Sequence, residues 1–207
     1  AIEFMRNYED GLSAVRYPRD NVSDIAMNKL GGVCPPFVLG KAVCLTPDLD
    51  VQRGDLGAGP DVAVLAFGTP AIDAIKAADQ LAADYKVAVY DARFAKPVDH
   101  DLIRSLLSRR IPIVTVEDHA VIGGFGAAVL ESAQLMGLDA SNVIRLGLPD
   151  SWIIQDSRSK QLAEAGLDAA GIARAIRAAA ELGATDRMLA GSPVQIVGRA
   201  AEATSRA

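Results

Sequence analysis

The run Asp61-Val62-Ala63-Val64-Leu65-Ala66-Phe67-Gly68 decides the fold that this sequence predicts. Its residues are apolar at odd and even positions alike, which is typical of a strand that helices cover on both faces. The next residues, 69–85, place apolar side chains at helical spacing, and Thr69-Pro70 forms a plausible helix start. A buried strand followed directly by an amphipathic helix is the repeating unit of an α/β domain.

The same unit repeats along the rest of the chain. Further strands are expected at residues 86–92, 111–117 and 142–148. Further helices are expected after the N-cap Asp99, and at residues 124–136, 159–165 and 168–182. Short connections between these elements predict an α/β fold with a mostly parallel sheet, in three αβα layers. The order of the strands in space stays open at this point.

The chain before this domain has a different pattern. A helix is expected at residues 2–9 and a short strand at 13–17, ended by Pro18. One helix and one strand cannot bury their apolar faces alone, so they must dock on something else. The sequence therefore divides into the end of a preceding α/β domain (1–20), an interdomain connection (21–59), the main domain (60–183) and a tail (184–207). The connection is rich in Gly and Pro, with at most one or two short strands near 37–45, and the tail is expected to fray or be disordered.

Composition excludes several classes of partner. The 207 residues carry 21 Lys and Arg against 26 Asp and Glu, and no basic cluster predicts nucleic-acid binding. Cys34 and Cys44 form no CxxC pair, so a zinc site is not expected and a reduced, intracellular compartment fits. No apolar stretch approaches the roughly 20 residues that span a bilayer, which predicts no membrane partner.

Arg19 is the one candidate for substrate binding. In Tyr17-Pro18-Arg19, Pro18 fixes the backbone, so that Arg19 projects from just beyond the C-terminal end of a predicted strand. Ligands of parallel sheets bind at that end, and the planar guanidinium suits a phosphate or a carboxylate. On the spacing alone, however, a surface ion pair is the favoured interpretation of Arg19.

Gly123-Gly124-Phe125-Gly126 stands between a predicted strand and a predicted helix, where nucleotide-binding loops occur. The spacing does not fit G-x-G-x-x-G, because the sixth position counted from Gly124 is Val129 and no suitable acidic residue follows about 20 residues later. We therefore expect close helix packing and a free helix N-terminus that could face a partner's carboxylate.

Two further polar groups follow predicted strands. Glu117-Asp118-His119 could include a proton-transferring histidine, although a polar strand end is the favoured interpretation because no Ser or Cys nucleophile is marked. Asp91 and Arg93 could pair with each other. The sequence thus predicts no catalytic, cofactor-binding or metal-binding residue in this chain.

Several segments together resemble a known family. Residues 12–19 (LSAVRYPR) are similar to the end of the pyrimidine-binding domain of 1-deoxy-D-xylulose-5-phosphate synthases. The family's transketolase-type C-terminal domain is matched at 62–69 (VAVLAFGT), 91–99 (DARFAKPVD), 116–126 (VEDHAVIGGFG) and 146–150 (LGLPD). The resemblance runs from about residue 2 to 182. The β subunits of 2-oxo-acid dehydrogenases share the domain but usually read closer to Leu-Arg-Thr before the Lys-Pro, and they remain an alternative, as does a stand-alone interaction domain.

The resemblance implies a cytoplasmic, homodimeric transferase that uses thiamine diphosphate and magnesium. Such enzymes decarboxylate pyruvate and join the two-carbon unit to glyceraldehyde 3-phosphate, for isoprenoid, thiamine and pyridoxal synthesis. The arginine that matches Arg19 binds the phosphate of the aldehyde. Asp20 stands where the family usually has Gly, which puts the strength of that site in question.

The resemblance also implies which parts are missing. The family's diphosphate and metal site, its cofactor-activating Glu and its substrate-facing histidines match no residue here and lie upstream of residue 1. The helical pattern that opens the chain without an initiator Met indicates a fragment. Such a fragment is expected to be inactive and to bind no cofactor alone. It would pack against a second subunit and the rest of the same polypeptide.

Overall fold

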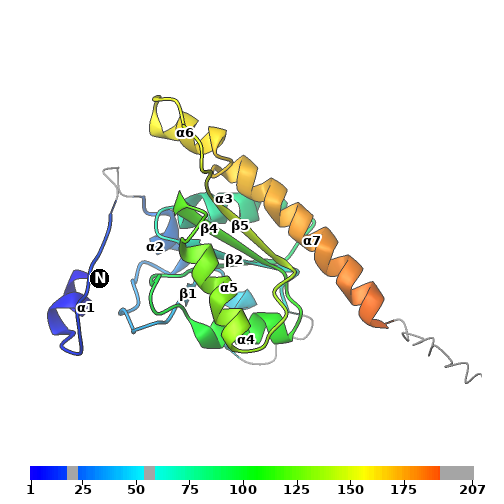
Figure 1. Cartoon of the computed structure of the whole chain (residues 1–207), viewed down its shortest axis with the longest axis horizontal. Coiled ribbons are helices and arrows are strands. Elements are labelled where there is room, and N and C mark those ends of the chain that lie inside the picture. Colours follow the sequence, from blue (N-terminus) through cyan, green and yellow to red (C-terminus); the bar gives the residue numbers. More distant parts are fainter. Residues whose placement is uncertain (18–22, 54–58, 192–207) are drawn as a thin grey trace, which may run out of the picture.

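The computed structural model describes residues 1–17, 23–53 and 59–191 and confirms the predicted α/β fold (Figure 1). Its five-stranded sheet has the order β1-β3-β2-β4-β5. Four strands are parallel: β2 (Val62–Phe67), β3 (Val87–Asp91), β4 (Ile113–Ala120) and β5 (Val143–Leu148). The two-residue strand β1 (Val43–Cys44) pairs antiparallel with β3 at one edge. The central strand β2 therefore has β3 on one side and β4 on the other, and the chain crosses β2 between β3 and β4.

Helices cover both faces of the sheet, as predicted. On one face lie α3 (Pro70–Leu81) and α7 (Ala169–Gly191), which pack against each other and against β2. On the other face lie α4 (His100–Ser108) and α5 (Phe125–Leu135). Residues of β2 alternate between the two apolar clusters, with Val62 and Val64 in the first and Ala63 in the second. This alternation explains why the strand is apolar at every position.

The last helix is longer than predicted. We expected it to end at Leu182, whereas α7 continues to Gly191, after the short helix α6 (Arg158–Glu164). Gly183 lets α7 pass directly against Pro112, since a side chain there would collide with the proline ring. The residues from Ala184 include Ala, Met and Leu, which favour a helix, and the first glycine among them is Gly191. The rest of the predicted tail, residues 192–207, lies outside the described residues.

The N-terminal prediction was half right. Helix α1 (Ile2–Asn7) is present, but residues 13–17 form no strand. Leu12 and Tyr17 point into solvent, with exposed fractions of 105% and 84%. A strand needs a neighbour to bond its backbone, and in the described part of the chain none lies beside this segment. Pro18, Arg19 and Asp20 fall outside the described residues.

The connection to the sheet domain contains more structure than its composition suggested. The expected short strand near 37–45 is β1, and the 3-10 turn η1 (Pro47–Leu49) follows it. Helix α2 (Ile25–Lys29) was not predicted, because five residues are too few to show a helical period. It packs against α3, and Lys29 forms an ion pair with Asp79 at 2.7 Å. No helix in the described ranges is long and apolar enough to cross a membrane.

Candidate functional site

The C-terminal ends of the four parallel strands meet at one edge of the sheet and bring the predicted polar residues together. Ligands of open α/β sheets bind where the strand order reverses. Here the reversal falls between β2 and β4, which pair in parallel through Phe67 and Glu117. The groups around it are the turn after β2, the Glu117-Asp118-His119 segment and the N-terminus of α5.

Glu117 fills the N-terminus of α5. Its side chain is buried, and its carboxylate accepts hydrogen bonds from the backbone N–H groups of Phe125 at 2.6 Å and Gly126 at 2.8 Å. A side chain at Gly124 would collide with this carboxylate, and one at Gly126 would collide with Thr115. The predicted close packing is therefore confirmed. The predicted free helix N-terminus is wrong, because a carboxylate of the same chain already occupies it.

Arg158 bridges the C-terminal ends of β2 and β4, where the strand order reverses. Its guanidinium donates to the Asp118 carboxylate at 2.6 Å and to the Thr69 hydroxyl at 3.1 Å, joining α6 to the ends of β2 and β4. His119 is exposed at the end of β4. Asp118 thus pairs with a cation, which agrees with a polar strand end rather than with an acid that orients a catalytic histidine.

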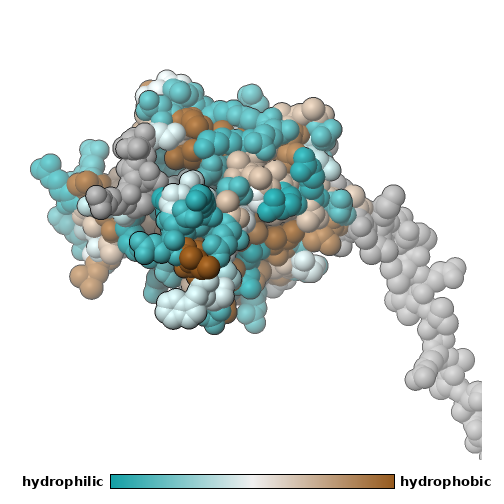
Figure 2. Space-filling view, turned by 90° about the horizontal axis from the view of Figure 1, so that it is seen from above, coloured by the Kyte–Doolittle hydropathy of each residue, from teal (hydrophilic) through white to brown (hydrophobic). Residues whose placement is uncertain are grey.

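Seen from above Figure 1, the molecule is mainly hydrophilic, with separate apolar groups (Figure 2). Three large side chains in the loops that follow β4 and β5 are exposed, namely Ile122, Trp152 and Ile154.

Arg93 stands at the end of β3 and holds the connection. Its Nη1 donates to the carbonyl oxygens of Pro35 at 3.0 Å and Pro36 at 2.9 Å, and its guanidinium carbon lies 4.3 Å from the centre of the Phe37 ring. Its side chain is 3% exposed. Its φ of 57° lies in the left-handed region, which costs a residue other than glycine about 1–3 kcal/mol and persists only where the surroundings fix it.

The predicted pairing of Asp91 with Arg93 is confirmed. Arg93 Nε lies 3.5 Å from Asp91 Oδ2, an ion pair without a hydrogen bond, and the Arg93 N–H donates to Asp91 Oδ1 at 3.2 Å. Burial raises the pKa of Asp91, while the charge of Arg93 and its hydrogen bonds act in the opposite direction.

Phe94, the next residue, joins two distant segments. Its ring meets Phe4 of α1 edge-on at 5.3 Å between centroids, and Phe37 of the connection at 5.9 Å. Phe4 in turn stacks on Tyr8 at 5.4 Å. Aromatic pairs at these distances contribute about 0.5–1.5 kcal/mol beyond the burial of their area. The end of β3 therefore holds both α1 and the connection.

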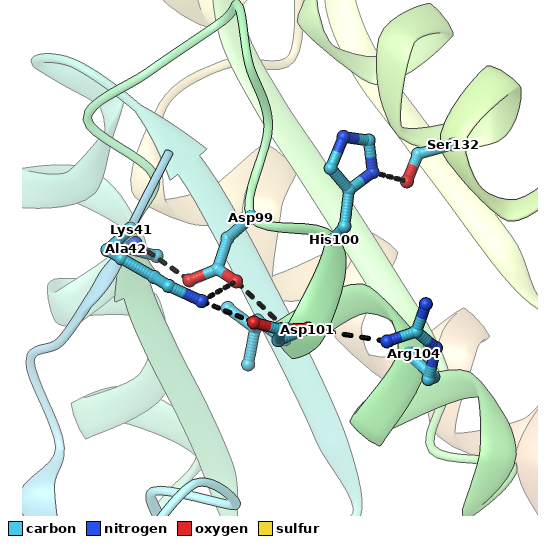
Figure 3. A network of polar contacts seen from close by, with 8 residues as sticks. Lys41, Ala42, Asp99, His100, Asp101, Arg104 and Ser132 are labelled. Atoms are coloured by element: carbon cyan, nitrogen blue, oxygen red, sulfur yellow. Dashed lines mark hydrogen bonds and ion pairs between the residues drawn. The ribbon is translucent and has the colours of Figure 1, made fainter. Parts of the chain in front are cut away.

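A second set of polar contacts ties the connection to α4 (Figure 3). Asp99 caps α4 by accepting from Leu102 N at 3.0 Å, as predicted, and also accepts from Ala42 N at 3.0 Å. Lys41 lies 3.5 Å from Asp99 and 2.6 Å from Asp101. The hydrogen bond to Asp101 is the main cause that raises the pKa of Lys41, and the same bond lowers the pKa of Asp101.

His100 makes the remaining contact of this network. Its Nδ1 lies 2.6 Å from the hydroxyl of Ser132, a buried residue of α5, so the pair joins α4 to α5. A small crevice beside Asp99 has otherwise apolar walls, among them Ala42, Leu65 and Phe125. Among the residues that the structure describes, no group of three His, Cys, Asp or Glu side chains could hold a metal ion.

Several contact residues were missed by sequence reasoning. Arg158, Lys41 and Phe37 gave no signal, because their partners Asp118, Asp99 and Phe94 are 40 or more residues away in the sequence. The cap signal at Asp99 was readable, but its second bond to the connection was not. The prediction for Arg19 falls outside the described residues, so its geometry is not placed.

Comparison with known proteins gives consistent matches. Residues 55–172 match the family described as transketolase, C-terminal domain. The chain is 38% identical over 169 residues to 1-deoxy-D-xylulose-5-phosphate synthase 1 of Geobacter metallireducens, covering 81% of this chain and 25% of the relative. It is 40% identical over 166 residues to the synthase of Nitrosospira multiformis, covering 80% and 24%. The synthase of a Synechococcus strain is 37% identical over 191 residues, covering 91% and 26%.

A solved structure agrees on the fold. The chain matches a split-gene transketolase, an inactive β4 tetramer, with a TM-score of 0.59 and 27% identity, covering 71% of this chain and 44% of that one. The chain therefore spans about a quarter of the length of the curated relatives that it matches and less than half of this solved chain.

Proposed function

The chain belongs to the transketolase C-terminal domain family, and we propose that it forms the C-terminal part of a thiamine-diphosphate-dependent transferase. The proposed reaction condenses pyruvate with glyceraldehyde 3-phosphate to give 1-deoxy-D-xylulose 5-phosphate and carbon dioxide, in the cytoplasm. The observation that carries this proposal is the similarity to synthases over 80–91% of the chain, at 37–40% identity. That similarity far exceeds what a shared fold alone would require.

In this proposal the described residues support the site rather than perform the chemistry. Their polar side chains are engaged with one another, as in Glu117 on the α5 N-terminus and Asp118 with Arg158. Arg93, Phe94 and Asp99 bind the connection to the sheet domain. The domain would thereby brace the preceding domain of the enzyme, with Arg19 as the contact to the phosphate of the aldehyde.

The described residues do not fit the cofactor or its metal. A diphosphate would need a free helix N-terminus or a glycine-rich cradle, and the candidate at 123–126 is filled by the Glu117 carboxylate. Magnesium prefers carboxylate and water oxygens, and at the point where the strand order reverses Glu117 is bound to backbone amides and Asp118 to Arg158. Thiamine diphosphate and magnesium would accordingly be held by parts of the enzyme outside this chain.

We further propose that the 207-residue chain is inactive alone and associates with a second subunit in a homodimer of the complete enzyme. The similarity to the split-gene transketolase supports the first point, since the tetramer of that chain is described as inactive. The exposed apolar residues of α1 and of the segment after it, such as Ile2 and Leu12, are suited to packing against further protein.

Calorimetry and a coupled assay test the proposal. The chain alone should show no micromolar binding of thiamine diphosphate with magnesium, and it should release no carbon dioxide from pyruvate. The longest polypeptide that its coding sequence encodes should produce 1-deoxy-D-xylulose 5-phosphate. Acyl transfer to a lipoyl group by that polypeptide with an α subunit would instead identify a 2-oxo-acid dehydrogenase. A start codon immediately before Ala1 would point to a stand-alone domain.

The role of Arg19 is tested by substitution in that active polypeptide. Arg19→Ala should raise the apparent KM for glyceraldehyde 3-phosphate far more than the KM for pyruvate. Loss of one charge-assisted phosphate contact costs about 1.5–3 kcal/mol, which corresponds to roughly a tenfold to 150-fold change. Equal effects on both KM values would refute the phosphate role.

A further inference from the structure

We propose that the outer edge of β5 is a self-association surface, on which β5 of a second copy of this chain pairs antiparallel and joins the two sheets. This inference rests on the proposed homodimer and names the surface that its two C-terminal domains share. The two edges of the sheet differ. At one edge, β1 covers β3. At the other, no strand in the described part of the chain pairs with the outer side of β5.

The outer side of β5 carries backbone groups that a further strand can bond. The Asn142 carbonyl, just before β5, accepts from the N–H of Ile113 in β4. Because bonding alternates along a parallel pair, the even residues of β5 bond β4, and Arg145 and Gly147 direct their N–H and C=O groups outwards. Helices α7 and α5 lie on the two faces of the sheet, and none of the six residues of β5 is buried. Such an edge is a template for another strand.

The sequence of β5 suits an antiparallel pair with itself. With the two-fold axis at Leu146, Arg145 lies opposite Gly147 of the second copy, and such a pair exchanges both of its backbone hydrogen bonds. This register sets the Arg145 side chain beside a glycine and keeps the two Arg145 charges from facing each other. Arg145 is the single charged residue of β5, whereas natural proteins commonly protect an open edge with charges. The composition of β5 therefore favours pairing.

Exposed apolar side chains lie at both ends of this edge. At its C-terminal end, the loops after β4 and β5 carry Ile122, Trp152 and Ile154, which are 69%, 98% and 77% exposed. At its N-terminal end, Leu135 closes α5 and is 84% exposed. A two-fold axis across an antiparallel pair exchanges the two ends of the strand. The group around Trp152 in each copy therefore meets Leu135 of the other copy.

The area at this edge suits a second copy as the occupant. Burial of Trp152 removes about 150–250 Å² from water, and burial of an Ile or Leu side chain removes about 60–120 Å². The four exposed side chains together offer about 300–600 Å², against the roughly 800 Å² per partner of a stable interface. The backbone of β5 and the polar residues around it supply the rest. A single added strand would leave the apolar ends uncovered, whereas a second copy covers both at once.

Sedimentation equilibrium of the 207-residue chain tests the self-association and needs no activity. The wild type should dimerise with a Kd in the micromolar range or tighter. Trp152→Lys and Leu135→Glu should each raise this Kd at least tenfold. The matched control Val33→Glu, at a 68% exposed position of the connection, should change it less than twofold. A wild type that stays monomeric would overturn the proposal, as would equal weakening by the control.

An equimolar mixture of the two variants tests the antiparallel pairing. In a mixed dimer, the lysine of Trp152→Lys faces the glutamate of Leu135→Glu, and the other end keeps the native contact between Trp152 and Leu135. The mixture should therefore recover a Kd within about threefold of the wild type, although each variant alone is weakened. Circular dichroism checks that the variants are folded, and Ile154→Lys replaces Trp152→Lys if that variant is not. A mixture no tighter than its components would overturn the pairing.

Hydrogen exchange identifies what covers the edge. The amides of Arg145 and Gly147 should exchange at least tenfold more slowly at concentrations above the Kd than below it. Amides that are already protected in the monomer would assign the edge to another segment of the same chain and overturn the proposal. If the longest encoded polypeptide forms no 1-deoxy-D-xylulose 5-phosphate, the proposed function fails, while sedimentation of the 207-residue chain still decides whether β5 pairs with a second copy.

Discussion

The sheet domain and the chain that precedes it are held by different kinds of interaction. In the domain, β2 is buried from Val62 to Ala66 between two apolar clusters. In the preceding chain, neither α1 nor α2 contains a buried residue. That chain is attached instead by specific contacts, chiefly those of Arg93 with Pro35 and Pro36 and of Asp99 with Ala42.

The two kinds of interaction have different consequences, one for the stability of the sheet domain and the other for the position of the preceding chain. Burial of apolar surface contributes roughly 25 cal/mol per Å² without regard to direction, so it stabilises the domain but tolerates small shifts. Hydrogen bonds and ion pairs add less free energy but fix distances and angles. Substitutions in the domain core should therefore mainly lower stability. Substitutions at the contacts to the preceding chain should mainly release that chain.

The largest effect is expected in the core. Leu106→Ala removes a fully buried side chain from the cluster between α4 and the sheet, and it should lower the free energy of unfolding by about 2–5 kcal/mol. Urea unfolding followed by circular dichroism measures this loss. The matched variant Leu135→Ala, at an exposed position of α5, should change it by less than about 0.5 kcal/mol. Similar losses in both variants would contradict the two-cluster description of the core.

The next effect is expected at Glu117. Glu117→Ala leaves the buried N–H groups of Phe125 and Gly126 without their acceptor and should destabilise the domain by about 2 kcal/mol. Glu117→Gln keeps one acceptor oxygen and should lose about half as much. Chemical unfolding of both variants measures these changes. Equal losses for Ala and Gln would show that the carboxylate does not serve both amides.

A smaller effect on stability is expected at Asp99. Asp99→Ala removes the cap of α4, which costs about 1 kcal/mol, and it also removes the acceptor for Ala42. Asp99→Asn should retain most of the cap, because Asn is an equally good N-cap residue. Thermal unfolding gives the stability, and exchange of the Ala42 amide reports release of the connection. Asp101→Ala, which removes only the exposed ion pair with Lys41, should cost less stability than Asp99→Ala. Protection of the Ala42 amide in Asp99→Ala would contradict the contact.

The smallest effect is a difference in pH dependence. Burial raises the pKa of Asp91 above its ordinary value near 3.8, so the folded protein takes up this proton at a higher pH than the unfolded chain does. The carboxylate therefore weakens folding above its raised pKa, and stability is regained as the pH falls from that pKa towards the ordinary value. Asp91→Asn cannot show this gain. Between pH 7 and 4, the urea midpoint of the wild type should rise relative to that of Asp91→Asn as the pH falls, and parallel profiles would disprove the shift.

The sheet domain could be predicted from the sequence because its signals are local. The strands 62–67 and 87–91 are apolar at odd and even positions alike, which indicates buried strands. The cap at Asp99 is followed by apolar residues at helical spacing, which indicates an amphipathic helix. The strand predicted at 13–17 failed for the opposite reason. A strand is completed by its neighbour, and apolar alternation cannot show whether that neighbour is beside it.

The sequence by itself determined the class of fold, the course of the strands and helices, and the resemblance to a synthase family, because each depends on residue types near one another in the chain. Only the tertiary structure decided which polar groups meet. It put Glu117 on the helix that was expected to be free, Arg158 between β2 and β4, and Arg93 on the backbone of two prolines 57 and 58 residues earlier. The Arg158 contacts follow from the crossing of β3 and β4 to opposite sides of β2, which sets the ends of β2 and β4 side by side, and that order in space has no signature in local sequence.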